Sequence, residues 1–133
     1  MIINLKGEVS HDGEINFDLP PVYFTEDQYV HATEIFLRFD KQVTHPNGYI
    51  TTNLIEKSIV NQTQQLIFFQ QSAKSGDLYF TPLHIAEYKI RQHCLDNGKF
   101  KLLLFDKNNN LDFRKLTVQV YLQLKITVKT KHR

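Results

Sequence analysis

A strictly alternating segment near the C-terminal end constrains the fold more than any other part of the sequence. Within residues 117–128, the apolar side chains occupy every second position: Val118, Val120, Leu122, Leu124, Ile126 and Val128. Because successive side chains of a β-strand point to opposite faces, this pattern predicts a strand with one buried face. A helix would scatter the same residues around its circumference. The residues between them, including Gln119, Tyr121 and Gln123, are expected on the wetter face.

Further β-type segments fill most of the chain. Tyr29 to Phe39 also alternates but carries apolar residues on both faces, which indicates a strand partly covered on both sides. Six shorter runs complete the set: Ile2 to Lys6, Glu14 to Asp18, Tyr49 to Leu54, Gln65 to Gln70, Leu78 to Thr81 and Phe100 to Phe105. Turn-forming pairs such as Asp12-Gly13 and Asn47-Gly48 predict hairpins between them. Residues 83–94 fit a short helix nearly as well as an edge strand.

These segments define the expected class of fold. About eight short strands separated by turns predict an all-β protein, and we expect an antiparallel, jelly-roll-like β-sandwich. The 10 Phe and 6 Tyr residues agree with a β-rich core.

Length and composition are those of one globular domain. The 133 residues are 41% hydrophobic and 23% charged, and the single cysteine, Cys94, cannot form an internal disulfide. We therefore assign residues 1–128 to one β-sandwich domain and residues 129–133 to a basic C-terminal tail. Four cations lie in the last nine residues: Lys125, Lys129, Lys131 and Arg133.

Charge and hydropathy limit the expected partners and location. The formal net charge of +2 is too balanced for a dedicated nucleic-acid binder, so contact with nucleic acid is expected only through the basic tail. The N-terminal segment lacks the pattern of a signal peptide, and no apolar run approaches the length of a membrane span. We therefore expect a soluble protein made in a reducing compartment.

Motifs that would carry chemistry are weak. The six His residues show no metal-binding spacing, and His93 and Cys94, as neighbours in a strand, would point to opposite faces. Residues 106–112 resemble the start of a calcium loop, but Leu111 stands where that loop needs Gly and Thr117 where it needs Glu. We therefore predict no catalytic residue, no metal ligand and no cofactor. An enzyme whose His and acidic groups are brought together only by folding remains an alternative.

Two surface hypotheses follow instead. Apolar strand residues next to uncharged amides suit contact with another chain, and the stretch Asn61 to Gln71 is rich in both. The simpler alternative for this stretch is a strand core flanked by amides. The candidate assembly surface consists of Gln65, Ile67, Phe69, Gln119, Tyr121 and Gln123. The alternative is a module that binds a glycan or peptide on tyrosine rings, with these candidates: Tyr23, Tyr49, Tyr79 and Tyr88.

The order of these features resembles a known group of proteins. The resemblance rests on four segments: the opening Ile3 to Gly7, the Pro20-Pro21 pair, the long strand from Tyr29 to Phe39, and the block from Phe100 to Lys125. In these the chain resembles small β-rich structural or surface proteins of virophages and polinton-like double-stranded DNA viruses.

The resemblance implies a non-enzymatic protein of the virion, made in the host cytoplasm, which serves as a minor capsid, vertex or attachment component. It also implies self-assembly into trimers or pentamers and contact with other capsid proteins. No catalytic residue or cofactor is carried over. The chain lacks a long basic N-terminal arm, which argues against direct genome packaging.

Overall fold

The computed structural model describes residues 1–25, 27–43, 46–70, 75–80, 86–106 and 109–129, and it is built from β-strands. The strands are β1 (Ile2–Val9), β2 (Glu14–Phe17), β3 (Gln28–Val43), β4 (Pro46–Thr52), β5 (Gln65–Gln70), β6 (Ser75–Phe80), β7 (Tyr88–Lys89), β8 (Phe100–Asp106), β9 (Asn109–Asn110) and β10 (Val118–Val128). The one helical element in these ranges is the short 3-10 turn η1 (Leu95–Asn97). The predicted all-β class is confirmed.

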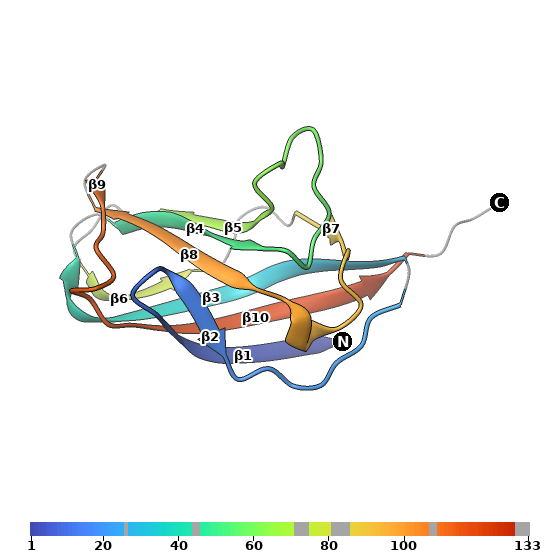
Figure 1. The fold of residues 1–133 in the computed structure, drawn as a ribbon, viewed down its shortest axis with the longest axis horizontal. Helices are drawn as coiled ribbons and strands as arrows, with labels where there is room; N and C mark the ends of the chain where they lie inside the picture. Colours follow the sequence, from blue (N-terminus) through green and yellow to red (C-terminus); the bar gives the residue numbers. More distant parts are fainter. Residues whose placement is uncertain (26, 44–45, 71–74, 81–85, 107–108, 130–133) are drawn as a thin grey trace.

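The strands form two layers that face each other. Strands β1, β10, β3 and β6 make the first sheet, and β2, β8, β4 and β5 make the second. The β1–β2 hairpin connects the two sheets, because β1 lies in the first and β2 in the second. Hydrogen-bonded strands therefore follow one another without a break from β5 to β6. Figure 1 shows β4, β5 and β8 lying over β3, β10 and β1. The chain is therefore a sandwich whose two sheets are joined along one side.

The order of pairing explains how a single chain makes this sandwich. Among the eight longer strands, the first pairs with the last, the second with the second last, the third with the third last, and the two middle strands with each other. All these pairs are antiparallel. Such nested pairing is that of one long hairpin rolled into two layers, as in a jelly roll. The prediction of an all-β, antiparallel sandwich is confirmed.

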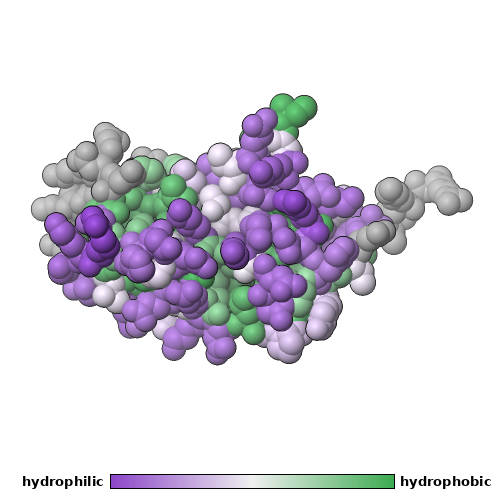
Figure 2. Space-filling view, viewed as in Figure 1, coloured by the Kyte–Doolittle hydropathy of each residue, from purple (hydrophilic) through white to green (hydrophobic). Residues whose placement is uncertain are grey.

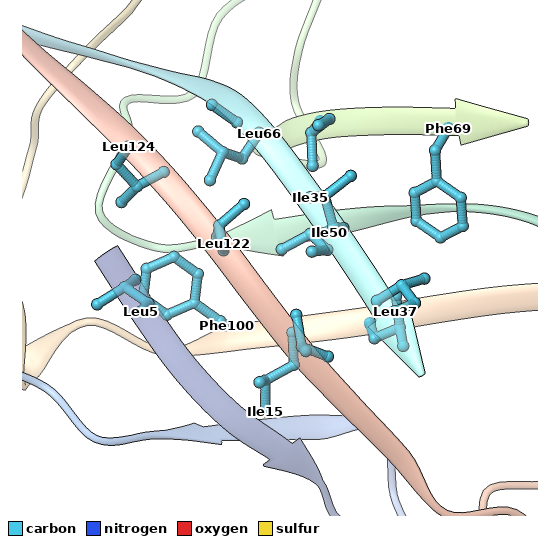
Figure 3. Close-up of a cluster of buried hydrophobic side chains, with 14 of the residues drawn as sticks. Leu5, Ile15, Ile35, Leu37, Ile50, Leu66, Phe69, Phe100, Leu122 and Leu124 are labelled. Carbon is cyan, nitrogen blue, oxygen red and sulfur yellow. The ribbon is translucent and has the colours of Figure 1, made fainter. Parts of the chain in front are cut away.

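The core lies between the sheets and is filled by the inward side chains of both. From the first sheet, Leu5, Ile35 and Leu122 are buried, and Figure 3 shows them packed against residues of the second sheet. Ile50 and Phe100 are among those partners. Each Leu, Ile or Phe buried in this way stabilises the fold by about 1.5–3 kcal/mol.

Backbone geometry confirms one predicted turn and corrects another. Gly13 has a φ of 87°, a value that glycine adopts without strain, and it closes the β1–β2 hairpin as predicted. Asn47-Gly48 was predicted to be a turn, but both residues lie inside β4. Gly48 has a different role there, because a Cβ atom at this position would lie 2.0 Å from the Leu103 carbonyl oxygen. Strands β4 and β8 can therefore approach each other only because this residue has no side chain.

A bulge in β3 explains why its apolar pattern is mixed. The pairing with β10 shifts between Gln123 and Leu124, which are opposite Glu34 and Ala32. Thr33 is therefore the extra residue of the bulge. On its C-terminal side the core-facing side chains of β3 stand at odd positions, and on its N-terminal side they stand at even positions. For residues 83–94 the sequence fitted a short helix and an edge strand almost equally well. In the structure, Tyr88–Lys89 forms the short strand β7 beside β3. Residues 83–85 lie outside the described part.

Candidate functional site

The residues predicted for the wetter face of β10 lie where expected. Gln119, Tyr121 and Gln123 point outward from the first sheet, whereas the residues between them are buried. This outer face also includes side chains of β1 and β3, which flank β10 on its two sides. We call the surface formed by these three strands the β10 face.

The prediction for β5 is wrong for two of its three residues. Ile67 and Phe69 belong to the core, with exposed fractions of 5% and 0%, whereas Phe68 is 56% exposed. Gln65 is half-buried and lies opposite Thr51, which itself faces away from the core. Leu66 is an extra residue in the pairing with β4, and it too is buried. The apolar residue that β5 presents outward is therefore Phe68.

Across the β10 face, aromatic rings and cations form a continuous row. Lys6 of β1 and Phe36 of β3 lie opposite Tyr121 on its two sides. The rings of Phe36 and Tyr121 pack edge to face, with their centres 5.7 Å apart. The Lys6 ammonium lies 5.5 Å from the centre of the Tyr121 ring, and the Arg38 guanidinium lies 5.5 Å from that of Phe36. Four residues that are separated in sequence thus form one surface feature.

Amide and hydroxyl groups hold the adjoining part of the face in a fixed arrangement. The Gln123 side chain donates a hydrogen bond of 2.9 Å to the side-chain oxygen of Asn4. Its own amide oxygen accepts one of 2.8 Å from the Thr33 hydroxyl. Between this network and the aromatic row lies a hollow whose lining includes Asn4, Lys6, Glu34, Phe36, Tyr121 and Gln123. The face therefore combines ring surfaces with oriented polar groups.

A second outward-facing apolar row crosses the other sheet. Phe68 of β5 and Leu103 of β8 both lie opposite Tyr49, on its two sides. Tyr49 and Leu103 are partly buried and Phe68 is more exposed. This row contains no charged side chain, which distinguishes it from the row on the β10 face.

One end of the β10 face holds a buried histidine. His31 of β3 is 5% exposed, its Nδ1 atom has no hydrogen-bond partner among the described residues, and burial lowers the pKa of its side chain. Lys125 reinforces this lowering and Glu87 opposes it. Glu87 forms an ion pair of 2.7 Å with Lys129, whose ammonium lies 4.5 Å from the centre of the Tyr29 ring. Lys129, the first residue of the predicted tail, is therefore held against the sandwich.

The single cysteine is placed as a structural residue. Cys94 is buried and His93 beside it is exposed, so the two side chains lie on opposite sides of the backbone as predicted. The Cys94 thiol donates a hydrogen bond to the Asp96 carboxylate, and this bond together with burial raises the pKa of the thiol. A raised pKa lowers the fraction of reactive thiolate.

The loop that resembled a calcium site forms a hairpin in its described part. Asn109 and Asn110 make β9, which pairs with β8. The Asp112 carboxylate accepts hydrogen bonds from the Arg114 guanidinium, which lower the pKa of Asp112. Within the described ranges, no three His, Cys, Asp or Glu side chains come together in a way that could hold a metal ion.

The candidate tyrosines are not gathered in one place by any described contact. Tyr23 is exposed in the segment before β3, Tyr49 faces outward from β4, and Tyr88 is half-buried in β7, where burial raises its pKa. The side chain of Tyr79 lies outside the described part. The tyrosine that does join an aromatic row on the β10 face is Tyr121.

Sequence reasoning missed the two large apolar residues that are most exposed within the described ranges. Ile59 and Val60 are 94% and 95% exposed and lie in the segment that connects β4 and β5. Figure 1 shows this segment projecting from the sandwich, and Figure 2 shows hydrophobic atoms at its tip. A signal was present in the sequence, because the pair stands between Ser58 and Asn61 where a tight turn would ordinarily carry polar residues.

The sequence matches no protein-family model, and no curated protein matches it. In the ranges that the structure covers, no helix is long and apolar enough to cross a membrane. The fold and its two faces define the class of protein: an all-β, antiparallel sandwich with an aromatic and cationic row on one sheet and an apolar row on the other.

Proposed function

We propose that this chain is a non-enzymatic structural protein of a virion that works by assembling with further copies of itself. The observation that carries the proposal is the row of Lys6, Tyr121, Phe36 and Arg38 across three strands of the β10 face. Tyr, Phe and Arg are enriched in protein–protein interfaces, where rigid rings provide contact area at a small entropic cost.

The character of the β10 face favours another copy of the chain as its partner. The face carries Glu8 and Glu34 beside Lys6, Arg38 and Lys125, so it holds both signs of charge and can complement itself. The amide network of Gln123 and Asn4 leaves further hydrogen-bonding capacity at the surface. Two like faces can therefore place opposite charges against each other.

Fold and resemblance support the virion setting by analogy. Jelly-roll sandwiches recur in viral capsid proteins and also in lectins, so the fold alone does not decide between them. The resemblance of the block from Phe100 to Lys125 to virion proteins of small DNA viruses favours the capsid role. It also suggests trimers or pentamers, with other capsid proteins as partners.

The test is the mass of the full chain in solution at rising concentration, measured by light scattering after size exclusion. We expect a concentration-dependent shift from monomer to a defined oligomer, and we expect Tyr121→Ser and Phe36→Ser to weaken it. Tyr23→Ser is the matched control, because Tyr23 is exposed but lies outside the β10 face. A chain that stays monomeric at high concentration, alone and with other virion components, would contradict the proposal.

A glycan-binding module is the second candidate, favoured by the hollow on the β10 face. There the Glu34 carboxylate and the Asn4 and Gln123 amides stand beside the rings of Tyr121 and Phe36. Aromatic faces with nearby carboxylate and amide groups suit the apolar and hydroxyl surfaces of a sugar ring. A glycan array would test it: binding that Glu34→Ala abolishes supports this function, and an array without hits removes it.

A further inference from the structure

The loop between β4 and β5 presents two apolar side chains away from the rest of the protein. Ser58 and Asn61 exchange backbone hydrogen bonds of 3.4 and 3.2 Å, so Ile59 and Val60 form the tip of a two-residue turn. Both side chains are almost fully exposed (Figure 2). Tight turns most often carry Gly, Pro, Asn, Asp or Ser. Neither Ile59 nor Val60 has a positive φ, so the backbone accepts these residues, but their apolar side chains are unusual at an exposed turn. Two adjacent apolar side chains that are exposed to solvent work against solubility, and such a local choice is typical of a functional site.

The loop holds this tip outward by its own bonding. At its base, Leu54 and Ile55 are buried in the core. The Asn61 side chain bonds both the backbone N–H and the carbonyl oxygen of Gln65, at 2.9 and 3.1 Å. The Gln64 side chain donates a hydrogen bond of 2.7 Å to the Ile55 carbonyl oxygen across the two arms of the loop. The apolar pair is therefore presented by a braced structure.

Cations surround the foot of the same loop. The segment that contains Lys89 and Arg91 runs beside the first arm, where the Glu56 N–H donates to the Lys89 carbonyl oxygen and the Arg91 N–H to that of Leu54. Lys57 and Arg91 line a shared hollow with Glu56. Lys57, Lys89 and Arg91 are all exposed, and Glu56 is the one acidic side chain among these residues. From Lys57 to Gln65 the chain contains no acidic residue.

We propose that the Ile59–Val60 tip inserts into the surface of a lipid bilayer that contains anionic lipids, with Lys57, Lys89 and Arg91 contacting the headgroups. An apolar tip above a basic foot is the arrangement by which peripheral proteins bind such surfaces. The polar but uncharged residues beside the tip, Ser58 and Asn61, would lie at headgroup level. A lipid surface fits better than a protein socket, because the tip projects alone and the three cations at its foot outnumber the one acid, Glu56. The proposal does not rest on assembly through the β10 face.

The chain offers a clean spectroscopic test because it contains no Trp. In Val60→Trp, the single indole should shift its emission to shorter wavelength when vesicles of phosphatidylcholine with 30% phosphatidylserine are added, and brominated lipid should quench it. In the matched variant Tyr23→Trp, a probe on another exposed segment, the emission should not change.

Co-sedimentation with the same vesicles measures the contribution of each part. Ile59→Asp with Val60→Asp should lower the partition coefficient roughly tenfold or more, because two apolar side chains would no longer be buried. Neutralising Lys57, Lys89 and Arg91 should lower the partition coefficient roughly fivefold per cation removed. High salt should also lower the partition coefficient, because it screens the same charges. Val128→Asp, at an exposed apolar residue elsewhere, is the control that should bind normally.

Three results would overturn the proposal. They are a failure to bind the anionic vesicles, binding that the double Asp variant leaves unchanged, and a double Asp variant that lowers the oligomeric mass instead of vesicle binding. The last would show that the tip contacts a second copy. Because both substituted side chains are exposed, the melting temperature of each variant should stay close to that of the parent and thus exclude misfolding as the cause.

Discussion

Neighbouring phenylalanines on β5 offer a direct test of which face of this strand is buried. Phe68 and Phe69 are the same residue type at adjacent positions, but Phe69 is fully buried and Phe68 is 56% exposed. The two alanine substitutions therefore remove the same atoms from opposite faces of one strand. Any difference between them reports burial rather than chemistry or strand propensity.

The expected effects differ several-fold. Phe69→Ala should lower the free energy of unfolding by about 3–5 kcal/mol, because it loses both the transfer free energy of the ring and the packing around it. Phe68→Ala should cost about 1 kcal/mol, since less than half of its surface is buried and no cavity forms. For a chain of this length, an unfolding entropy of about 2.1 cal/mol/K per residue converts these values into melting-temperature losses of about 11–18 °C and 4 °C.

Urea unfolding followed by circular dichroism gives both free energies, and the slopes should agree with those of the parent chain. Equal losses for the two variants, or a larger loss for Phe68→Ala, would show that the burial assigned to β5 is wrong. The pairing of β4 and β5 would then place the wrong side chains of β5 in the core.

Other predictions concern close packing, pH and the aromatic row. Gly48→Ala should destabilise the fold by about 3 kcal/mol in urea unfolding, because its Cβ would overlap the Leu103 carbonyl. Burial lowers the pKa of His31, so only the unfolded chain gains that proton as the pH falls below 6.5, and stability should drop there. His31→Gln should remove this drop, and an unchanged pH profile would refute the assignment. A double-mutant cycle on Lys6 and Tyr121 should give a coupling of about 0.5–1 kcal/mol, and a value of zero would mean that their contact contributes nothing.

The buried face of β10 could be predicted from the sequence, and that of β5 could not, for a physical reason. Residues 118–128 alternate between apolar and polar or amphipathic side chains. Burying one face of the strand therefore buries the apolar side chains and leaves the others outward. In β5, the run from Leu66 to Phe69 is apolar throughout, and the bulge at Leu66 breaks the alternation. Both possible registers bury apolar residues, and only the pairing with β4 decides between them.

The candidate site was predictable only in part for a similar reason. Tyr121 was identified from its own strand, but Lys6 and Phe36 reach it through the registers of β1 and β3, which no local pattern encodes. Gly48 was misread because the same residue type serves both turns and close backbone contacts. Ile59 and Val60 were detectable in principle, since two adjacent β-branched residues stand between the polar residues Ser58 and Asn61.

The most direct measurement of assembly through the β10 face is the labelling of a cysteine placed on it. In a Cys94→Ser background, Gln119→Cys should react with maleimide at a normal rate in dilute solution and much more slowly at concentrations where the oligomer forms. Lys99→Cys, at an exposed position away from that face, should react equally fast at both concentrations. Equal reactivity of Gln119→Cys in monomer and oligomer would contradict the account.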